Sequence, residues 1–119
     1  MRRMADFDTV REITSAWPGV EETTSWGQPT LKVGGKMFTC MAAHKSAEPG
    51  SLVVRVDFER RAELLEEAPE VYYLTDHYTG YAGVLVRLAK IRKDALRGLL
   101  AGAVQFVAAE KKKKKPARS

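Results

Sequence analysis

The middle of the chain alternates between apolar and polar residues with the period of two that sends successive side chains to opposite faces of a β-strand. Residues 51–57 show this pattern most clearly, residues 84–89 repeat it, and the short run 71–74 predicts a brief strand or bridge. In the first of these segments, the side chains expected on the buried face are Leu52, Val54 and Val56. The pattern therefore predicts a sheet that buries one face in the core.

Two glycines, Gly34 and Gly35, divide the alternating residues 30–42 and predict a β-hairpin. A two-residue primed turn needs positive φ at both positions, which glycine adopts readily. The pairs that this turn would place opposite each other are Leu31 with Phe38 and Lys32 with Met37. The same alternation sends Cys40 into the core with Phe38, where a thiol would be buried and inert.

Other segments carry apolar residues at three- and four-residue steps, which is the spacing of one helix face. They are residues 6–17, 58–68 and 94–109. The predicted N-caps are Asp6 and Asp57, and the prolines expected to end the first two helices are Pro18 and Pro69. The apolar stripes are Phe7, Val10, Ile13 and Trp17, then Phe58, Ala62 and Leu65, then Leu96, Leu99, Leu100, Ala103 and Val107.

The predicted order of elements is α-β-β-β-α-(β)-β-α. Because sequential strands usually pair as neighbours, we expect an α+β fold of two layers, with an antiparallel sheet and helices packed on one face. A chain of 119 residues fits one domain. We assign this domain to residues 1–110 and regard residues 111–119 as a basic tail that is disordered beyond a possible last helical turn.

The tail accounts for the basic character of the chain. The formal net charge is +5, but residues 111–119 contain five lysines and one arginine. Taking these six from the 20 basic residues leaves 14 against 15 acidic residues, a net charge of −1 for the body. Cys40 is the only cysteine, and no long apolar run or secretory signal is present. We therefore expect a cytoplasmic protein that does not span a membrane.

Three stretches of the sequence resemble the MmcQ/YjbR family. They are Pro18-Gly19-Val20-Glu21-Glu22, then Trp26-Gly27-Gln28-Pro29 running into Leu31–Phe38, and finally Ala68-Pro69 through Tyr72-Tyr73, Thr75–Tyr81 and Val84–Leu88. Ala82 departs from the family pattern, in which proline often follows the Gly-Tyr pair. The resemblance covers about residues 5–108. It implies a YjbR-like α+β domain similar to frataxin-type (CyaY-like) domains. The family carries a DNA-binding label, so the resemblance also implies DNA binding, without roles for individual residues.

The face of the sheet away from the helices would carry one cation per strand. These cations are Lys32, Arg55 and Arg87, interleaved with Met37, Met41, Val53 and Leu85. Such a face could hold a phosphate backbone or an anionic ligand. Alternatively, the cations pair with Asp57 and nearby glutamates on a solvated face.

The segment Thr75–Tyr81 is rich in side chains that can carry function. Asp76, His77, Tyr78 and Tyr81 could supply an acid, a titratable ring and two stacking rings, as in proteins that bind single-stranded bases. Alternatively, the tyrosines fill the core edge and Asp76 caps a turn. Trp26 follows a polar linker and is interpreted either as an exposed stacking platform or as a lid on the edge of the core.

Metal binding and catalysis receive little support from the sequence. The histidines His44 and His77 and the single Cys40 form no closely spaced ligand pair, so we predict no metal. The glutamates near residues 63–70 are mixed with Arg60 and Arg61 and predict a solvated helix face. No phosphate-binding glycine motif is present, so we predict no cofactor. Adjacent Asp76 and His77 would diverge in extended structure, which argues against an enzyme.

The sequence thus favours a non-enzymatic protein of the MmcQ/YjbR type that binds DNA or another polyanion. The lysines of the tail, Lys111, Lys112, Lys113, Lys114 and Lys115, would add charge without shape selectivity, or would only keep the chain soluble. The alternative is a module that binds a small molecule or a protein through the same sheet face and the Thr75–Tyr81 loop.

Overall fold

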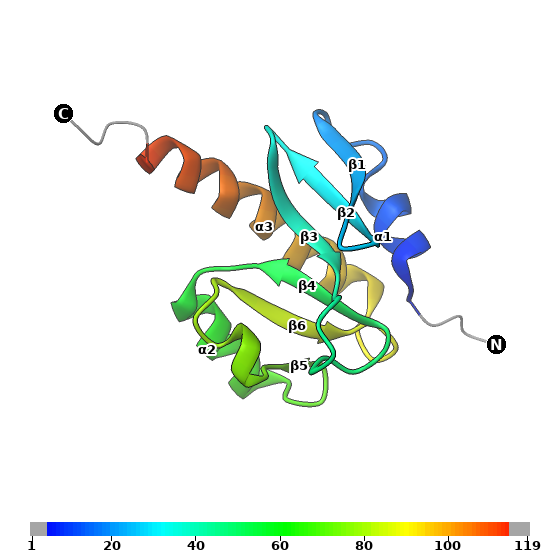
Figure 1. The fold of residues 1–119 in the computed structure, drawn as a ribbon, viewed down its shortest axis with the longest axis vertical. Helices are drawn as coiled ribbons and strands as arrows, with labels where there is room; N and C mark the ends of the chain where they lie inside the picture. The colour runs from blue at the N-terminus through cyan, green and yellow to red at the C-terminus, as the bar shows by residue number, and fades with distance from the viewer. Residues whose placement is uncertain (1–4, 115–119) are drawn as a thin grey trace.

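The computed structural model describes residues 5–114, with the side chains of residues 5–110. The elements in this range are α1 (Phe7–Thr14), β1 (Val20–Ser25), β2 (Gln28–Val33), β3 (Lys36–Met41), β4 (Ser51–Arg55), α2 (Phe58–Glu67), β5 (Tyr72–Tyr73), the 3-10 helix η1 (Asp76–Tyr78), β6 (Gly83–Arg87) and α3 (Lys93–Lys114). Figure 1 shows β1, β2 and β3 in one half of the sheet and β4, β6 and β5 in the other.

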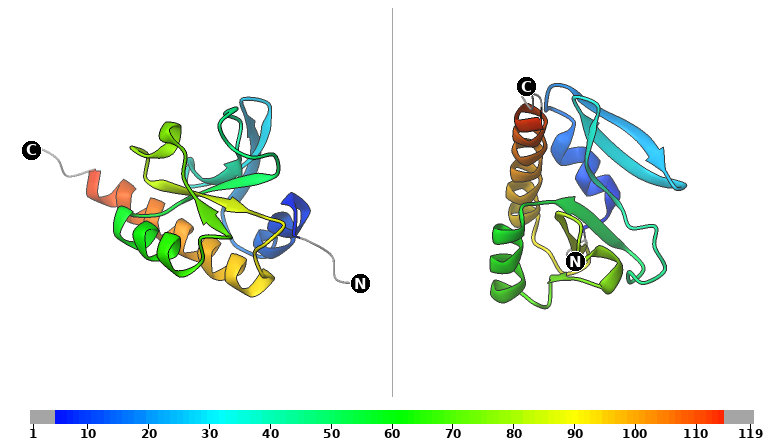
Figure 2. Two further views of the ribbon diagram at one scale, coloured as in Figure 1. Left: turned by 90° about the horizontal axis from the view of Figure 1, so that it is seen from below. Right: turned by 60° about the vertical axis from the view of Figure 1, so that its left-hand side comes forward.

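The sheet of the described residues has six strands in the order β1-β2-β3-β4-β6-β5, and every neighbouring pair is antiparallel. Figure 2 shows the three α-helices on one side of this sheet, with the turn of η1 on the other. Side chains of all three helices join one core with the sheet, as the 0% exposure of Val10, Leu96 and Leu100 illustrates. The predicted fold class is confirmed.

The hairpin between β2 and β3 has the predicted turn but a different register beyond it. Gly34 and Gly35 have φ of 60° and 80°, and Lys32 pairs with Met37 as expected. Leu31, however, pairs with Thr39, because a β-bulge makes Phe38 an extra residue in β3. The predicted pairing of Leu31 with Phe38 is therefore wrong.

The bulge also changes the face to which Cys40 belongs. Phe38 and Thr39 are both fully buried, after which Cys40 pairs with Val53. Val53 alternates with core residues and lies on the sheet face away from the helices, so the prediction that Cys40 enters the core beside Phe38 is wrong. The half-buried thiol of Cys40 lies on that outer face instead.

Strand β1 was not predicted, because its sequence Val-Glu-Glu-Thr-Thr-Ser lacks apolar alternation and was interpreted as a linker. It pairs with β2 from Val20 opposite Val33 to Ser25 opposite Gln28 and forms one edge of the sheet. An edge strand needs little burial, and charged residues on it discourage pairing with other chains.

Helix α2 buries a different stripe from the one predicted. Phe58 is 51% exposed and Ala62 is exposed, whereas Leu64 and Arg61 are buried. The predicted cap is correct, since the Asp57 side chain accepts a hydrogen bond from the backbone N–H of Arg60. The buried stripes predicted for α1 and α3 are largely confirmed, although α1 ends at Thr14 rather than at residue 17.

Helix α3 runs through Glu110 to Lys114, so the helix includes the start of the lysine run. The side chains of Lys111, Lys112, Lys113, Lys114 and Lys115 lie outside the described residues, and the division between domain and tail stays a prediction. Among the described helices, none is long and apolar enough to cross a membrane.

Candidate functional site

A cavity of about 590 Å³ opens on the sheet face away from the helices. It brings together side chains from the β1–β2 turn, β3, the loop after β3, β4 and the segment around η1. The residues that line it are Trp26, Met37, Cys40, Met41, Ala43, His44, Val53, His77, Tyr78 and Tyr81. We call this cavity the ring pocket, because aromatic and imidazole rings make up much of its wall.

The ring pocket contains four of the residues that the sequence singled out, Trp26, His77, Tyr78 and Tyr81. Asp76, the fifth candidate from this region, is exposed at the start of η1 and is not among the lining residues. The backbone from Asp76 to Tyr78 is a 3-10 helix and not the extended segment on which the predicted divergence of Asp76 and His77 rested.

Two imidazoles form one wall of the ring pocket. The rings of His44 and His77 stack with centroids 3.5 Å apart and an interplanar angle of 8°. Tyr78 meets His77 edge-on, with centroids 4.9 Å apart. Sequence reasoning did not single out His44 for this role, because no local spacing relates it to His77.

The protonation of His44 is set by this environment. Burial lowers the pKa of His44, and the charges of His77 and Lys45 lower it further. The backbone N–H of Ser46 donates to Nδ1 of His44 at 3.1 Å, so that nitrogen acts as an acceptor and carries no proton. The wall of the ring pocket is therefore neutral at His44 under ordinary conditions.

The loop that carries His44 is fastened to its neighbours by side-chain contacts. Ser46 Oγ and Thr75 Oγ1 are 2.8 Å apart, and the Tyr73 hydroxyl accepts the backbone N–H of Glu48 at 2.8 Å. Arg87 forms two hydrogen bonds to the Glu48 carboxylate, at 2.9 and 2.8 Å, and its guanidinium lies 4.3 Å from the Tyr73 ring centroid. Arg87 thus holds this loop in place.

Arg55 is engaged in a similar way beside Tyr81, another residue that lines the ring pocket. Its Nη2 lies 3.0 Å from the Glu110 carboxylate, its Nε donates to the carbonyl of Ala82 at 2.9 Å, and its guanidinium lies 5.0 Å from the centroid of the Tyr81 ring. Lys36 joins the same carboxylate at 3.1 Å. Arg55 and Arg87 therefore follow the alternative interpretation of ion-paired cations, although their partners are Glu110 and Glu48 rather than Asp57.

Arg61 was predicted to lie on a solvated face, and this prediction is wrong. Its side chain is buried and donates to the carbonyls of Tyr81, Thr79 and Gly83 at 2.8, 3.0 and 3.3 Å. A buried guanidinium requires such acceptors. Arg61 consequently fixes the loop that presents Tyr81 to the ring pocket.

Lys32 and Lys45 are the cations beside the ring pocket that no carboxylate of the described residues occupies. Lys32 lies opposite Met37, a lining residue, and Lys45 follows His44 directly. Neither lysine forms an ion pair within residues 5–110, whereas Lys36, Arg55 and Arg87 all do. Lys45 was not singled out from the sequence.

Trp26 stands at the rim of the ring pocket with its side chain 90% exposed. It occupies the first position of the two-residue turn between Ser25 and Gln28, with φ of 55°, and Gly27 follows with φ of 76°. Asparagine and glycine are the residues that such a turn favours. Of the two interpretations offered above for Trp26, the exposed platform agrees with this position.

The thiol in the ring pocket is not set up to react. Burial raises the pKa of Cys40 to about 11, so the thiol stays protonated at neutral pH. No Asp or Glu of the described residues lines the pocket. No group of three or more His, Cys, Asp or Glu within the described range is arranged to hold a metal ion, and the absence of a metal in the protein stays a prediction.

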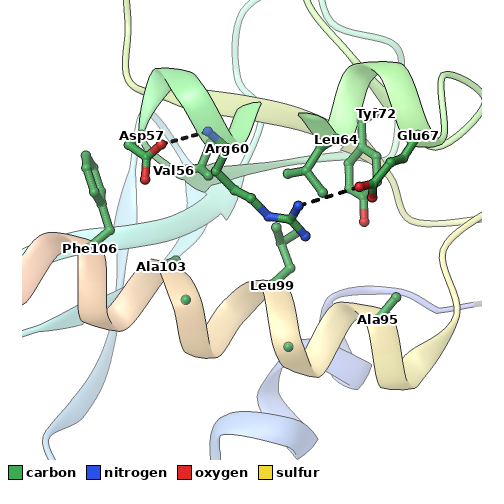
Figure 3. Close-up of a pocket in the computed structure, with 12 residues that line it drawn as sticks. Val56, Asp57, Arg60, Leu64, Glu67, Tyr72, Ala95, Leu99, Ala103 and Phe106 are labelled. Carbon is green, nitrogen blue, oxygen red and sulfur yellow. Dashed lines mark hydrogen bonds and ion pairs between the residues drawn. The ribbon is translucent and has the colours of Figure 1, made fainter. Parts of the chain in front are cut away.

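Another cavity, of about 500 Å³, lies between α2 and α3. Figure 3 shows Arg60 reaching from α2 toward Glu67 above Leu99 of α3. The other residues that line this cavity include small side chains of α3 such as Ala95 and Ala103. Its aromatic lining residues are Tyr72 and Phe106, and Asp57 and Glu67 bring to it the carboxylates that the ring pocket lacks among the described residues.

The family model YjbR matches residues 15–104, a stretch that includes every residue that lines the ring pocket. The chain belongs to the YjbR family. It is 32% identical over 110 residues to the uncharacterised proteins Rv2570 of Mycobacterium tuberculosis and Mb2600 of Mycobacterium bovis, and the match covers 82% of this chain and 84% of each relative.

A solved YjbR-like structure has the same fold. The crystal structure of Deinococcus radiodurans protein DR2400, a DUF419 domain, matches with a TM-score of 0.72 and 24% identity, covering 98% of this chain and 83% of that one. At this identity the likeness concerns the fold alone. The further similarity to frataxin-type domains stays a prediction, and the function of this YjbR domain has to be argued from its geometry.

Proposed function

We propose that this YjbR-family chain is a non-enzymatic nucleic-acid-binding protein, in which the ring pocket contacts bases and the C-terminal lysines attract the phosphate backbone. The observation that carries the proposal is the ring pocket itself, where Trp26, Tyr78 and Tyr81 line one cavity. Rings that present flat faces beside cations are the usual means of holding bases without a covalent step.

The charges around the ring pocket support a polyanionic partner. No carboxylate of the described residues lines it, and Lys32 and Lys45 beside it have no ion-pair partner in that range. Arg55 and Arg87 are not offered as phosphate contacts, because Glu110 and Glu48 already occupy them. The general attraction therefore comes from the lysines after Glu110, and the sheet face adds a smaller share.

The absence of a catalytic role is part of the proposal. The Cys40 thiol stays protonated, and Asp76 stands outside the ring pocket, so the pocket offers neither an activated nucleophile nor a carboxylate base. His77 stacks on His44, and within residues 5–110 no carboxylate forms an ion pair or hydrogen bond with it.

A small flat ligand is a second candidate, which the shape of the cavity favours. A concave volume of about 590 Å³ lies within the range of roughly 300–1,000 Å³ that small-molecule sites occupy. Such a ligand would use the same rings and would need few phosphate contacts.

A salt titration separates these candidates. Binding of a fluorescein-labelled 15-mer single strand and of its duplex would be followed by anisotropy from low to high salt. Each phosphate contact contributes a slope of about −0.7 in log affinity against log salt for single strands and about −0.9 for duplexes. Replacing lysines 111–115 with glutamine preserves helix propensity, and we expect it to flatten the slope by several of these increments.

The matched variant Lys32→Gln/Lys45→Gln should flatten the slope by no more than about two increments. Failure of every oligonucleotide to bind at low salt would overturn the proposed function. Saturable binding of a nucleoside monophosphate in that same case would favour the small-ligand candidate.

A further inference from the structure

The fold itself does not favour a tryptophan at position 26. A bulky residue at φ of 55° is a backbone outlier, and an aromatic side chain that is 90% exposed leaves its apolar surface in water. Gly27 completes the turn without help from the indole. Strained backbone of this kind is concentrated at functional sites, so the indole is best explained by what it contacts outside the chain.

The opposite side of the ring pocket is held in place by contacts within the fold. Arg61 fixes the carbonyls around Tyr81, and the Ser46–Thr75 contact joins the His44 loop to the segment that begins η1. A flat ligand entering the cavity would therefore meet an ordered wall on one side and the exposed indole of Trp26 on the other. Only the indole has to be immobilised when the ligand binds, which keeps the entropy lost on binding small.

A concave pocket discriminates between paired and unpaired bases. In a duplex, both faces of each base are covered by its neighbours and its pairing edge is occupied, so only an unpaired base can stack on a side chain inside a cavity. The ring pocket offers a stacking surface on Trp26 and a wall of two stacked imidazoles with hydrogen-bonding nitrogens. Lys32 and Lys45 belong to separate segments beside the cavity and could receive the phosphates that flank such a base.

We infer that the ring pocket holds one unpaired base stacked on Trp26, with Lys32 and Lys45 as phosphate contacts, so that the protein selects single strands over duplexes. This inference rests on the proposed function and names the form of nucleic acid that the pocket takes. The lysines after Glu110 attract both forms, and the ring pocket supplies the difference between them.

The test compares four probes on the full chain. They are a fluorescein-labelled 15-mer of thymidine, its duplex with the complementary strand, the same single strand with abasic sites in place of its central bases, and thymidine monophosphate. The unsubstituted protein should bind the intact single strand more tightly than the duplex, and the abasic strand should lose most of this advantage.

Variants at Trp26 show whether the indole causes the difference in affinity between single strand and duplex. Trp26→Asn suits the turn and should weaken single-strand binding by roughly 5- to 150-fold, the range for loss of one stacked base, while duplex binding stays unchanged. Trp26→Phe retains a ring and should keep most of the affinity. Phe58→Gln is the matched control, since Phe58 is the other exposed large apolar residue of the described range and lies on α2.

Several results would overturn the inference. Equal binding of the intact and abasic strands would show that no base binds in the ring pocket. Equal effects of Trp26→Asn on single strand and duplex would show the same. If those results came with a steep salt slope, the proposed function would stand without this inference. Monophosphate binding as tight as strand binding would make a free nucleotide the ligand, and no binding to any oligonucleotide would overturn the proposed function itself.

Discussion

The side of the ring pocket that carries His44 and Tyr81 is held by several side chains, whereas the end of the β1–β2 turn that carries Trp26 is held by backbone pairing and a hydrogen bond of 3.1 Å from the Thr30 hydroxyl to the Gln28 carbonyl. On the first side, Arg55 and Arg61 bind carbonyls of the loop before β6, and Arg87 binds the loop after β3 through Glu48. On the second side, Ser25 pairs with Gln28, and the indole beyond them is 90% exposed.

This difference separates the cations that build the site from the residues that remain available to a ligand. An arginine whose donors are taken by carbonyls and carboxylates stabilises a loop and has little left for a phosphate. A side chain without such partners costs the fold little to redirect toward a ligand. In this molecule Arg55, Arg61 and Arg87 belong to the first group. Trp26, Lys32 and Lys45 belong to the second.

The largest effect on stability is expected from replacing Arg61, which holds the loop beside Tyr81 in place. Arg61→Met keeps much of the side-chain volume but leaves the carbonyls of Thr79, Tyr81 and Gly83 without this donor, so we expect unfolding free energy to fall by about 2–4 kcal/mol. Arg60→Met is the matched control on the same helix. Arg60 is 48% exposed in its pairs with Glu63 and Glu67, and its loss should cost less than about 1 kcal/mol. Urea denaturation measures both, and similar losses for the two variants would contradict the structural role of Arg61.

The sequence predicted the layers of the fold where burial follows a simple period. The alternation in residues 51–56 and the stripe ending at Val107 placed β4 and α3 correctly, and the pair of glycines placed the β2–β3 turn. It did not predict β1, since an edge strand of glutamates and threonines has no apolar alternation. Nor could it predict the bulge at Phe38, because one extra residue leaves the composition of a strand unchanged.

The candidate site was predicted in part for a related reason. Trp26, His77, Tyr78 and Tyr81 were singled out by residue type, and the structure brings them into one cavity. The stacking of His44 on His77 depends on where the loop after β3 lies, and no local spacing encodes that. The engagement of Arg55 by Glu110 joins residues 55 positions apart, so sequence alone could group the sheet cations but could not show which of them were already occupied.

A smaller effect on stability is expected from replacing Glu110, the carboxylate near the end of α3 that pairs with Lys36 and Arg55. Burial alone would raise the pKa of Glu110, but hydrogen bonds and charge from Lys36 and Arg55 outweigh it and hold the pKa below its ordinary value of 4.5. The unfolded chain therefore takes up this proton first as pH falls. The stabilisation is complete above about pH 4.5 and is lost as pH falls through the lower pKa of the folded state.

Glu110→Gln should consequently lower unfolding free energy by about 0.5–1 kcal/mol at pH 7, a modest value because the carboxylate is partly exposed. The gap in unfolding free energy from the unsubstituted protein should close as pH falls through the lowered pKa of Glu110 in the folded state. Glu59→Gln serves as the control, since Glu59 makes no ion pair within the described residues. Urea denaturation at several pH values measures the gap, and a gap that persists at low pH would show that the Glu110 carboxylate acts through packing rather than charge.

The smallest effect on stability, and of opposite sign, is expected from replacing Trp26 at the rim of the ring pocket. Trp26→Asn places Asn-Gly in a turn whose φ values of 55° and 76° suit that pair, so unfolding free energy should rise by up to about 1 kcal/mol. Trp26→Ala exposes equally little apolar surface but remains strained at positive φ, so it should gain less. Urea denaturation of the two variants isolates the backbone contribution from the loss of the indole. If both variants instead lose more than about 1 kcal/mol of unfolding free energy, the indole packs against the fold in solution and stabilises it. A gain in stability for the asparagine variant, together with its loss of single-strand binding, would show that the fold retains tryptophan at this turn for a ligand and not for itself.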